Sequence, residues 1–415
     1  MKKIICIVLS LVMVLGLVAC GGSSESQQAK VEETTETKVE ETKETEPVSS
    51  GEKVIKIGVF EPQSGKNGGG GLQEVYGIRY ANEIYNKVQI GGQEYRIELV
   101  EVDNKSDEKE AVTAAQKLIS EKVSIVLGSY GSGVSIAAGE YFKDAEIPAI
   151  GCSCTNPQVT EENEYYFRTC YLEPFQGEVM ASYCAKQGYK KVAVLMEAGD
   201  DYSEGLGGFF MNACKKQGIE VVSEERFQKD ASEFKPFLTN IQSKNPDFIF
   251  APSSIVAAPL ILSQARTLGI NCQIGAGDTW ENGSIIENAK EAAEGAVLTT
   301  FYEANPDTAT GEEALFLNGN DKVPGFLEYI KKFNEKSIPA VSALGYDSYL
   351  AAYKAIEKAQ TTKGSDIRNA LETLEYTGVT GLISYDEHGD AKKNSAFIKK
   401  VENGQFAYQD KVTIE

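Results

Sequence analysis

Histidine is almost absent from this chain of 415 residues, whose only one is His388. A Ser-His-Asp triad needs a histidine beside its nucleophile, and zinc centres usually combine several cysteines and histidines. Cys152 and Cys154 are separated by one residue, not by the two of a CxxC motif. Asp386 and Asp390 offer oxygen atoms for calcium, but their surroundings favour a solvated turn. Catalysis is therefore disfavoured, and we expect neither a metal nor a cofactor.

Positive charge is also in short supply, since 41 lysines and arginines stand against 61 aspartates and glutamates, for a net charge of −20. Such a charge argues against binding to nucleic acid and against direct adsorption to an anionic membrane surface. Glycine patterns that cradle phosphates are missing too. The four glycines at 68–71 have neither the GxGxxG nor the GxxxxGKS/T spacing, so we expect a plain glycine-rich loop there.

A long apolar run occurs only at the N-terminus, where residues 4–17 follow Lys2 and Lys3. The run is shorter than the roughly 20 apolar residues that span a bilayer. A basic start, a short apolar stretch and small residues before a cut are typical of a secretory signal, and the sequence LVAC ending at Cys20 makes it a lipoprotein signal. We expect cleavage of residues 1–19 and lipidation of Cys20, which anchors the protein stably. Loss of the two lysines takes the net charge from −20 to −22.

Residues 20–52 are rich in Glu, Thr, Lys and Ser and have almost no large apolar side chains. Such a stretch cannot bury enough surface to offset its ordering entropy, so we expect a disordered acidic linker. As a flexible coil it would hold the folded part on the order of 30 Å from the lipid surface. We expect it to be a spacer without a recognition role.

The remaining body is long enough for two domains. Its cysteines are even in number, which permits disulfides outside the cytoplasm, but a body of this size does not need them. We assign no pairing to these residues, which are Cys152, Cys154, Cys170, Cys184, Cys214 and Cys272.

Short β-branched runs alternate with amphipathic helices through the body. The first round has expected strands at 54–60, 96–102, 124–127 and 148–151 and expected helices at 72–86, 112–119 and 134–142. The second round has strands at 191–196, 220–225 and 247–250 and helices at 202–217 and 234–244. This alternation favours parallel sheets with helices on both faces, and two rounds predict two doubly wound lobes. Ligands of such sheets bind at the carboxyl ends of the strands.

A series of short motifs runs through the body in order. They are IGVFEPQSG at 57–65, VDNKSD at 102–107, LGSYGSG at 127–133, CTNP at 154–157, FRT at 167–169, GDDYSEG at 199–205, QAR at 264–266, GDTW at 277–280, ALGYD at 343–347, GVTG at 378–381 and YDEHGD at 385–390. Each is modest alone, but their order and spacing together are specific. The chain resembles the branched-chain amino-acid type of periplasmic binding protein, the extracytoplasmic receptor of ABC importers related to the leucine/isoleucine/valine-binding protein.

This resemblance implies an α/β fold of two doubly wound Rossmann-like lobes with a hinge, the type I periplasmic-binding-protein fold. Three crossovers would join the lobes. We place lobe one at 53–171 and 301–391 and lobe two at 172–300 and 392–415. A ligand would lie in the cleft between them, trapped by hinge closure with no bond made or broken.

The resemblance also implies contacts for a ligand carboxylate. In relatives that bind amino acids, the carboxylate is held by a hydroxyl at the position of Ser132, by the hydroxyl and amide at Thr155, and by a backbone group at Ser153. These loops lead from strand ends into helices, where free N–H groups and the helix dipole favour an anion. The alternative role for Ser132 and Thr155 is ordinary N-capping of their own helices.

Three aromatic residues are further candidates for the ligand site. Tyr202 matches a family tyrosine that lies over the ligand from lobe two, and its alternative is a surface or interlobe aromatic. Tyr130 and Trp280 are candidates for lining the pocket, although aromatic residues in such loops also pack structurally.

The acceptor for a ligand amino group is in question. The acidic residue that receives it in the leucine/isoleucine/valine-binding protein aligns near Ala257, where this chain has no carboxylate. Burying an unpaired ammonium is costly. Either Asp278, in the next βα loop, takes over this role, or the ligand is not an α-amino acid. Other branches of the family bind amides, urea, small carboxylates or aromatic acids.

The expected function is that of a lipid-anchored solute-binding protein on the extracytoplasmic face of the cell membrane. It would deliver a small polar ligand, first of all a branched-chain or related amino acid, to the permease subunits of an ABC importer. A sensory module that passes a ligand-bound conformation to a membrane receptor is the alternative, and co-transcription with permease and ATPase genes would distinguish the two. An enzyme is the last of the three hypotheses.

Overall fold

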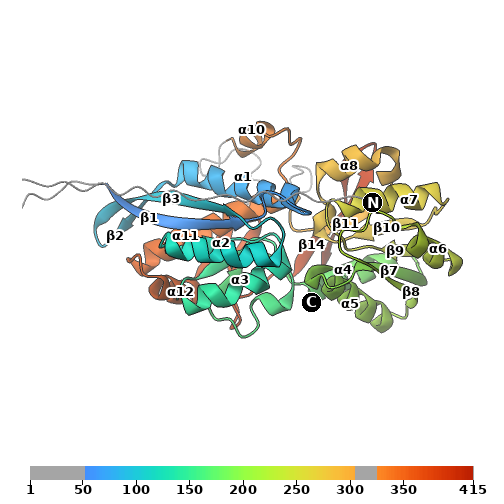
Figure 1. Cartoon of the computed structure of the whole chain (residues 1–415), viewed down its shortest axis with the longest axis horizontal. Coiled ribbons are helices and arrows are strands. Elements are labelled where there is room, and N and C mark those ends of the chain that lie inside the picture. Colours follow the sequence, from blue (N-terminus) through green and yellow to red (C-terminus); the bar gives the residue numbers. More distant parts are fainter. Residues whose placement is uncertain (1–51, 304–324, 415) are drawn as a thin grey trace, which may run out of the picture. The chain divides into compact units, whose positions relative to one another are not determined.

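The computed structural model describes residues 52–303 and 325–414. The expected signal peptide, the lipidated Cys20 and all of the expected linker except Glu52 lie outside these residues. Two β-sheets, each flanked by helices, dominate the described part of the chain (Figure 1).

The first sheet has six strands in the order β2-β3-β1-β4-β5-β6. Its strands are β1 (Lys53–Glu61), β2 (Lys87–Ile90), β3 (Gln93–Asp103), β4 (Ile125–Leu127), β5 (Ala149–Gly151) and β6 (Tyr166–Arg168). All neighbours pair in parallel except β2, which runs antiparallel to β3. The parallel strands therefore present their carboxyl ends at a single edge of the sheet.

Helices cover both faces of the first sheet. Consecutive residues of a strand point to opposite faces, so each strand contributes side chains to the core on either side. Ile57 and Val59 of β1 belong to a core cluster with Val75, whereas Phe60 belongs to a second cluster with Val134. The helices of this part are α1 (Gly68–Ile84), α2 (Glu108–Ser120), α3 (Ser132–Asp144), α10 (Phe326–Lys331), α11 (Ala340–Ala359) and α12 (Gly364–Glu372). Helix α1 packs on α11, and α2 packs on α3.

The second sheet has seven strands in the order β15-β14-β11-β10-β9-β7-β8. Its strands are β7 (Lys191–Glu197), β8 (Glu220–Phe227), β9 (Phe248–Phe250), β10 (Gln273–Ala276), β11 (Val297–Thr300), β14 (Ser395–Glu402) and β15 (Gln405–Thr413). The helices beside it are α4 (Glu173–Lys186), α5 (Asp201–Lys216), α6 (Lys235–Ser243), α7 (Ala257–Thr267) and α8 (Gly283–Ala289). Helix α4 packs on α5, and α7 packs on α8.

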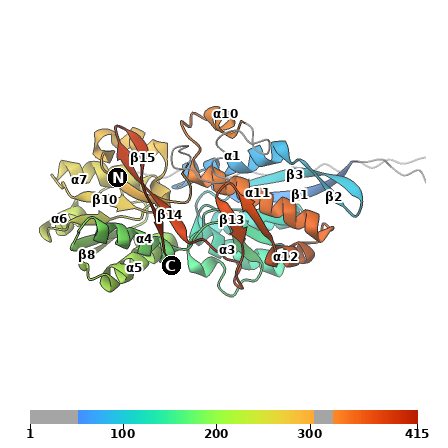
Figure 2. The ribbon, with the colours of Figure 1, turned by 180° about the vertical axis from the view of Figure 1, so that it is seen from behind.

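The chain alternates between the two sheets. It enters the second sheet after β6, and after β11 it supplies α11, which packs on α1, before it returns to the second sheet as β14. Strands β14 and β15 run antiparallel at the edge of that sheet, and the separate hairpin of β12 (Glu375–Gly378) and β13 (Gly381–Ser384) lies near α12 (Figure 2). The expected alternation of two doubly wound sheets is confirmed, while the exact lobe boundaries stay predictions.

The four-glycine run was expected to be a loop, and the structure corrects this, because α1 already begins at Gly68. Glycine is required there for close approach, since a Cβ on Gly70 would lie 2.3 Å from the Tyr130 ring. Further along α1, a Cβ on Gly77 would lie 1.9 Å from the Ser342 carbonyl oxygen of α11. These glycines lower helix propensity but allow tight packing.

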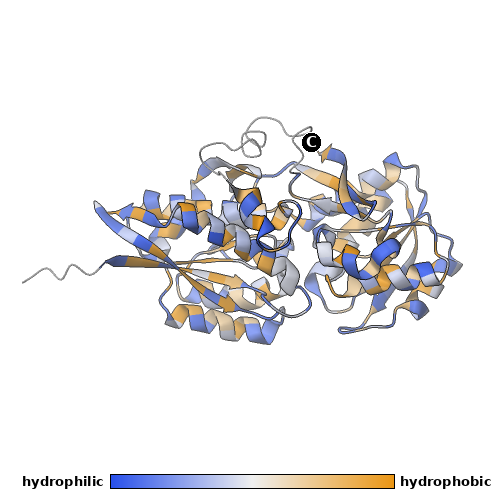
Figure 3. Cartoon of the chain, turned by 90° about the horizontal axis from the view of Figure 1, so that it is seen from above, coloured by the Kyte–Doolittle hydropathy of each residue, from blue (hydrophilic) through white to orange (hydrophobic). Residues whose placement is uncertain are grey.

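Hydrophobic residues concentrate on the strands and on the inner sides of the helices, with hydrophilic residues outside (Figure 3). The cysteines between Cys152 and Cys272 are all free thiols. No helix within residues 52–303 and 325–414 has the length and apolar character needed to cross a membrane.

Candidate ligand-binding site

A cavity of about 70 Å³ lies where the carboxyl ends of the two sheets meet. Loops that follow β1, β4, β7 and β10 line it, as the doubly wound topology predicts. Among the residues expected to bind a ligand, Tyr130, Ser132, Tyr202 and Asp278 line the cavity. The volume is several times the roughly 10–15 Å³ that admits one water molecule.

Ser132 is the first residue of α3 and is buried. Its hydroxyl oxygen accepts a hydrogen bond from the Asn156 backbone N–H at 3.2 Å, and within the described residues no hydrogen bond uses its proton. The N-cap is Gly131, so Ser132 does not cap its own helix through its side chain. Ser132, Gly133 and Val134 all line the cavity, which places the N-terminal N–H groups of α3 beside it.

Thr155 and Ser153 lie just behind this helix end, and both are buried. The Thr155 hydroxyl donates to Glu173 Oε1 at 3.4 Å, and the Ser153 hydroxyl donates to Glu74. The short helix η1 (Pro157–Val159) is capped by Asn156 and not by Thr155. The capping alternative therefore fails for Thr155 as it does for Ser132, while a role in ligand binding stays a prediction.

Asp278 opens the short helix η2 (Asp278–Trp280) directly after β10, and its side chain is buried. Its Oδ1 accepts hydrogen bonds from Gln176 Nε2 at 2.7 Å and from Tyr202 Oη at 3.1 Å. Burial raises the pKa of Asp278 to about 6, although these two bonds favour the charged form. Within residues 52–303 and 325–414 it forms no ion pair, so its partners are neutral.

Tyr202, the second residue of α5, brings its hydroxyl to Asp278 and also to Thr279 Oγ1 at 3.3 Å. Trp280 is buried as well, and its Nε1 donates to Ser253 Oγ at 3.1 Å. Trp280, like Ser153 and Thr155, does not contribute to the cavity lining, and its role beside a ligand stays a prediction. Ala257, near which the family's acid was expected, begins α7 and is likewise absent from the lining, whereas Asp278 is part of it.

Charged groups that sequence analysis did not single out connect the two sides of the cavity. Lys66, from the loop after β1, pairs with Glu197 at 2.8 Å and with Asp200 at 2.6 Å. Asp200 and Glu197 overcome the effect of burial and raise the pKa of Lys66. Lys229, the other lysine of the lining, pairs with Asp107 at 3.1 Å. Both cavity lysines are thus neutralised across the gap, which is the arrangement of a closed cleft.

A buried acidic pair supports the loops of the first sheet. Glu61 accepts the Tyr130 backbone N–H at 2.8 Å, and Glu74 accepts the Ser153 hydroxyl. Together with Cys152 they form the only group of potential metal ligands within the described residues, with ligand atoms inside 4.8 Å. Burial raises the pKa of Glu61 to about 8 and also raises those of Glu74 and Cys152, which favours bound protons. The signal in the sequence is Glu61, an acid that ends the continuously buried run 57–61 of β1.

The turn at 386–390 also has a structural assignment. Asp386 Oδ1 accepts the backbone N–H groups of His388 and Asp390 at 2.9 and 3.0 Å. The Asp390 carboxylate turns the other way and pairs with Arg168. Of the two carboxylates considered for calcium, that of Asp386 therefore stabilises the turn and that of Asp390 belongs to a buried ion pair.

Comparison with known proteins matches residues 54–405 to the family described as periplasmic binding protein. The chain belongs to this family. A Leu/Ile/Val-binding protein homolog of Brucella melitensis is 27% identical over 361 residues, which cover 85% of this chain and 92% of the relative. The leucine-specific-binding protein of Salmonella typhimurium is 26% identical, over 81% of this chain and 88% of that protein.

Solved structures of periplasmic binding proteins agree. A leucine-binding protein from Thermotoga maritima has a TM-score of 0.79 and 33% identity and covers 87% of this chain and 99% of its own. A branched-chain amino acid transporter substrate-binding protein from Streptococcus pneumoniae, in complex with isoleucine, has a TM-score of 0.77 and 28% identity, with the same coverage. The resemblance, the type I fold and a non-enzymatic, extracytoplasmic solute-binding function are therefore confirmed.

Proposed function

We propose that this periplasmic binding protein binds a branched-chain or related amino acid in the cavity between its sheets and delivers it to an ABC permease. The observation that carries the proposal is Asp278, a buried carboxylate in the cavity lining whose partners are neutral. An α-ammonium group would supply the missing positive charge. The N-terminus of α3 and the Ser132 hydroxyl, also in the lining, would receive the α-carboxylate without a counter-charge.

The relatives support this choice of ligand class. Those matched over most of this chain are named for binding leucine, isoleucine and valine, and the pneumococcal protein holds isoleucine. A solute-binding protein from Rhodopseudomonas palustris in complex with benzoate shares the fold, with a TM-score of 0.76 but only 19% identity. Benzoate has no ammonium, so it would leave Asp278 uncompensated in the closed cavity. We therefore favour an amino acid over aromatic acids, small carboxylates, amides and urea.

A thermal-shift screen of residues 51–415 against amino acids, amides, urea and aromatic acids tests the ligand class. A ligand that binds only the folded state raises the melting temperature by mass action. We expect L-leucine, L-isoleucine or L-valine to raise it and the amine-free compounds to leave it unchanged. Stabilisation by amine-free compounds alone would contradict the proposal.

We also propose that Cys20 carries the lipid anchor that keeps the protein at the extracytoplasmic face of the membrane. The support is the signal-like N-terminus that ends at this cysteine. Cys20→Ser should move the protein from the membrane fraction to the soluble fraction, with its melting temperature unchanged. Retention of a normally processed serine variant in the membrane would contradict the anchor, and this result would leave the ligand assignment untouched.

A further inference from the structure

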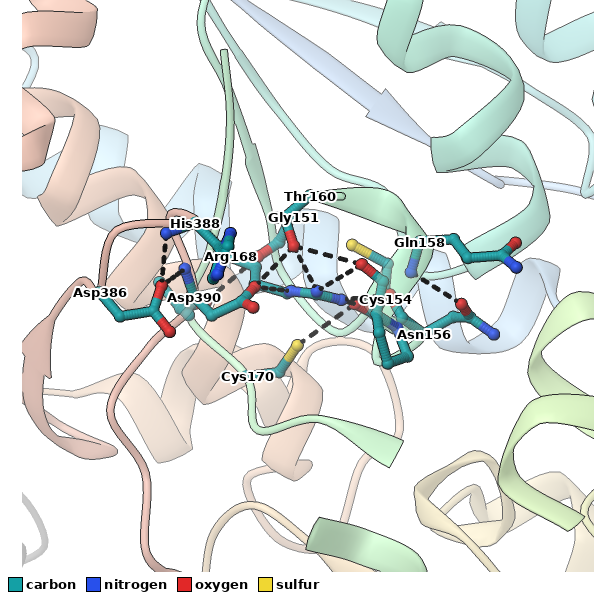
Figure 4. Close-up of polar contacts among 12 residues, drawn as sticks. Gly151, Cys154, Asn156, Gln158, Thr160, Arg168, Cys170, Asp386, His388 and Asp390 are labelled. Carbon is teal, nitrogen blue, oxygen red and sulfur yellow. Dashed lines mark hydrogen bonds and ion pairs between the residues drawn. The ribbon is translucent and has the colours of Figure 1, made fainter. Parts of the chain in front are cut away.

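Arg168 is a fully buried arginine at the end of β6, behind the loop that carries Thr155. A buried guanidinium is costly unless its charge is paired and its N–H groups are bonded. The charge is paired by Asp390, whose Oδ1 lies 2.5 Å from Arg168 Nε. The remaining donors go almost entirely to one loop (Figure 4).

That loop is held at several points by one side chain. Arg168 Nη1 donates to the Cys154 carbonyl at 2.8 Å and to the Asn156 carbonyl at 2.6 Å. Arg168 Nη2 donates to Thr160 Oγ1 at 2.7 Å, and this hydroxyl in turn donates to Asp390 at 2.9 Å. The carbonyls on both sides of Thr155 are therefore fixed by the same nitrogen atom.

Fixing the Cys154 carbonyl also fixes the Thr155 N–H. The two groups belong to one planar trans peptide and point in opposite directions, so the N–H points away from the guanidinium. Within the described residues this N–H donates no hydrogen bond. The next N–H, that of Asn156, donates to the Ser132 hydroxyl oxygen in the cavity lining.

We infer that Arg168 is a positioning residue for ligand binding, which holds the Cys154–Thr155 peptide so that the Thr155 N–H donates to the ligand's carboxylate. This inference rests on the proposed function. Arg168 itself touches no ligand. Asp390 belongs to the turn at 386–390. The Gly389 carbonyl of this turn accepts a hydrogen bond from the backbone N–H of Arg168 at 3.0 Å. A segment near the C-terminus thus orients a loop more than 200 residues earlier in the chain.

Arg168→Lys tests the inference, because a lysine keeps the charge for Asp390 but cannot hold two carbonyls with a planar fork. We expect the Kd for L-leucine to rise roughly tenfold or more, the range for a hydrogen bond to a charged group. We also expect faster amide hydrogen exchange in peptides covering 152–160, measured without ligand. Leu238→Ala, in the core of α6 beside the second sheet, is the control, and it should lower the melting temperature without either effect.

A wild-type Kd in Arg168→Lys, or unchanged exchange at 152–160, would overturn the inference. If the lysine variant does not fold, Thr160→Val carries the test, since it removes one partner of Arg168 at nearly constant volume and should weaken binding and speed exchange in the same direction. Failure of the wild-type protein to bind leucine, isoleucine or valine would contradict the proposed function instead. The exchange comparison would still decide whether Arg168 orders the loop.

Discussion

The carboxyl ends of the two sheets offer a ligand opposite electrostatics. At the first sheet, the buried Arg168 is paired with Asp390, and burial raises the pKa values of Glu61 and Glu74, which favours bound protons. The groups of this sheet that reach the lining include Ser132 and the N–H groups of α3, besides the paired Lys66. At the second sheet, Asp278 reaches the lining, and within the part of the chain that the structure describes its carboxylate accepts hydrogen bonds only from Gln176 and Tyr202. The difference teaches that one end suits an anion held by neutral donors and the other suits a cation.

Glu281, three residues after Asp278, shows that this difference is local. Both carboxylates are buried, but Glu281 pairs with Lys399 at 2.5 Å and also accepts the Thr300 hydroxyl. Lys399 is shared with Glu303 at 3.5 Å. Glu281 is thus a structural carboxylate that Lys399 neutralises. Asp278, in contrast, would be neutralised only by a cationic group of the ligand.

Exchanging these two acids for amides should give the largest effect. Asp278→Asn leaves a bound ammonium unpaired, which costs about 3–5 kcal/mol for a buried pair and weakens L-leucine binding by roughly 100-fold or more. Glu281→Gln should instead lower the free energy of unfolding and leave the Kd nearly unchanged. Calorimetric titration and chemical unfolding of both variants measure this. Equal losses of affinity in the two variants would erase the distinction between them.

Ser132→Ala tests the side of the cavity that is proposed to bind the ligand's carboxylate. Loss of one hydrogen bond to a carboxylate should cost about 1.5–3 kcal/mol, or roughly 10- to 150-fold in Kd. Ser135→Ala is the matched control, because Ser135 lies in the same helix but its hydroxyl donates to the Gly131 carbonyl. Thr155→Val should behave like Ser132→Ala. Wild-type affinity in both would remove these hydroxyls from the site.

Acid should weaken binding through Asp278. Its pKa in the ligand-free protein is raised to about 6, so below this pH the carboxyl must lose a proton before it can pair with an ammonium. We expect the Kd for L-leucine to rise by about tenfold per pH unit below this value and to level off above it. The ligand-free protein should respond in the opposite sense. The contribution of Asp278 to its free energy of unfolding falls as the pH rises from about 4 to about 6, because in this range the folded state holds the Asp278 proton and the unfolded state does not. Asp278→Asn should remove this contribution and the loss of affinity below pH 6.

Lys66→Gln should give the smallest effect, because it removes only the two ion pairs of one side chain across the cleft. Lys66 is partly exposed, so its bonds to Glu197 and Asp200 are worth little in water and the Kd should rise roughly two- to fivefold. The loss should appear in the dissociation rate and shrink at high salt. Lys235→Gln, an exposed lysine on α6, is the control. A loss that does not depend on salt would argue against an electrostatic closure contact.

Much of the fold follows from local pattern. The strand and helix periods predicted β1, β7, α5 and their neighbours closely, because each element has its own apolar face. The sequence did not reveal the start of α1 at Gly68, because that helix depends on the distant residues Tyr130 and Ser342. Local pattern also did not reveal the antiparallel strands β14 and β15, whose pairing is set by the edge of a finished sheet.

The residues of the site could likewise be predicted only in part from the sequence. Family motifs indicated Tyr130, Ser132, Tyr202 and Asp278, which the fold brings to one cavity. They gave no role to Lys66 or Arg168, because their partners lie 131 and 222 residues away along the chain. Ion pairs of such range are visible only once the sheets are assembled.

The most direct test of the account compares L-leucine with 4-methylpentanoate, which has the same side chain and carboxylate but no amine. Calorimetry should show that the wild-type protein binds L-leucine roughly 100-fold or more tightly than 4-methylpentanoate, because only the amino acid neutralises Asp278. In Asp278→Asn this preference should collapse or reverse, since the amide no longer requires a cation. Equal binding of the two ligands by the wild-type protein, or a preference that survives Asp278→Asn, would contradict the claim that Asp278 receives the ligand's ammonium.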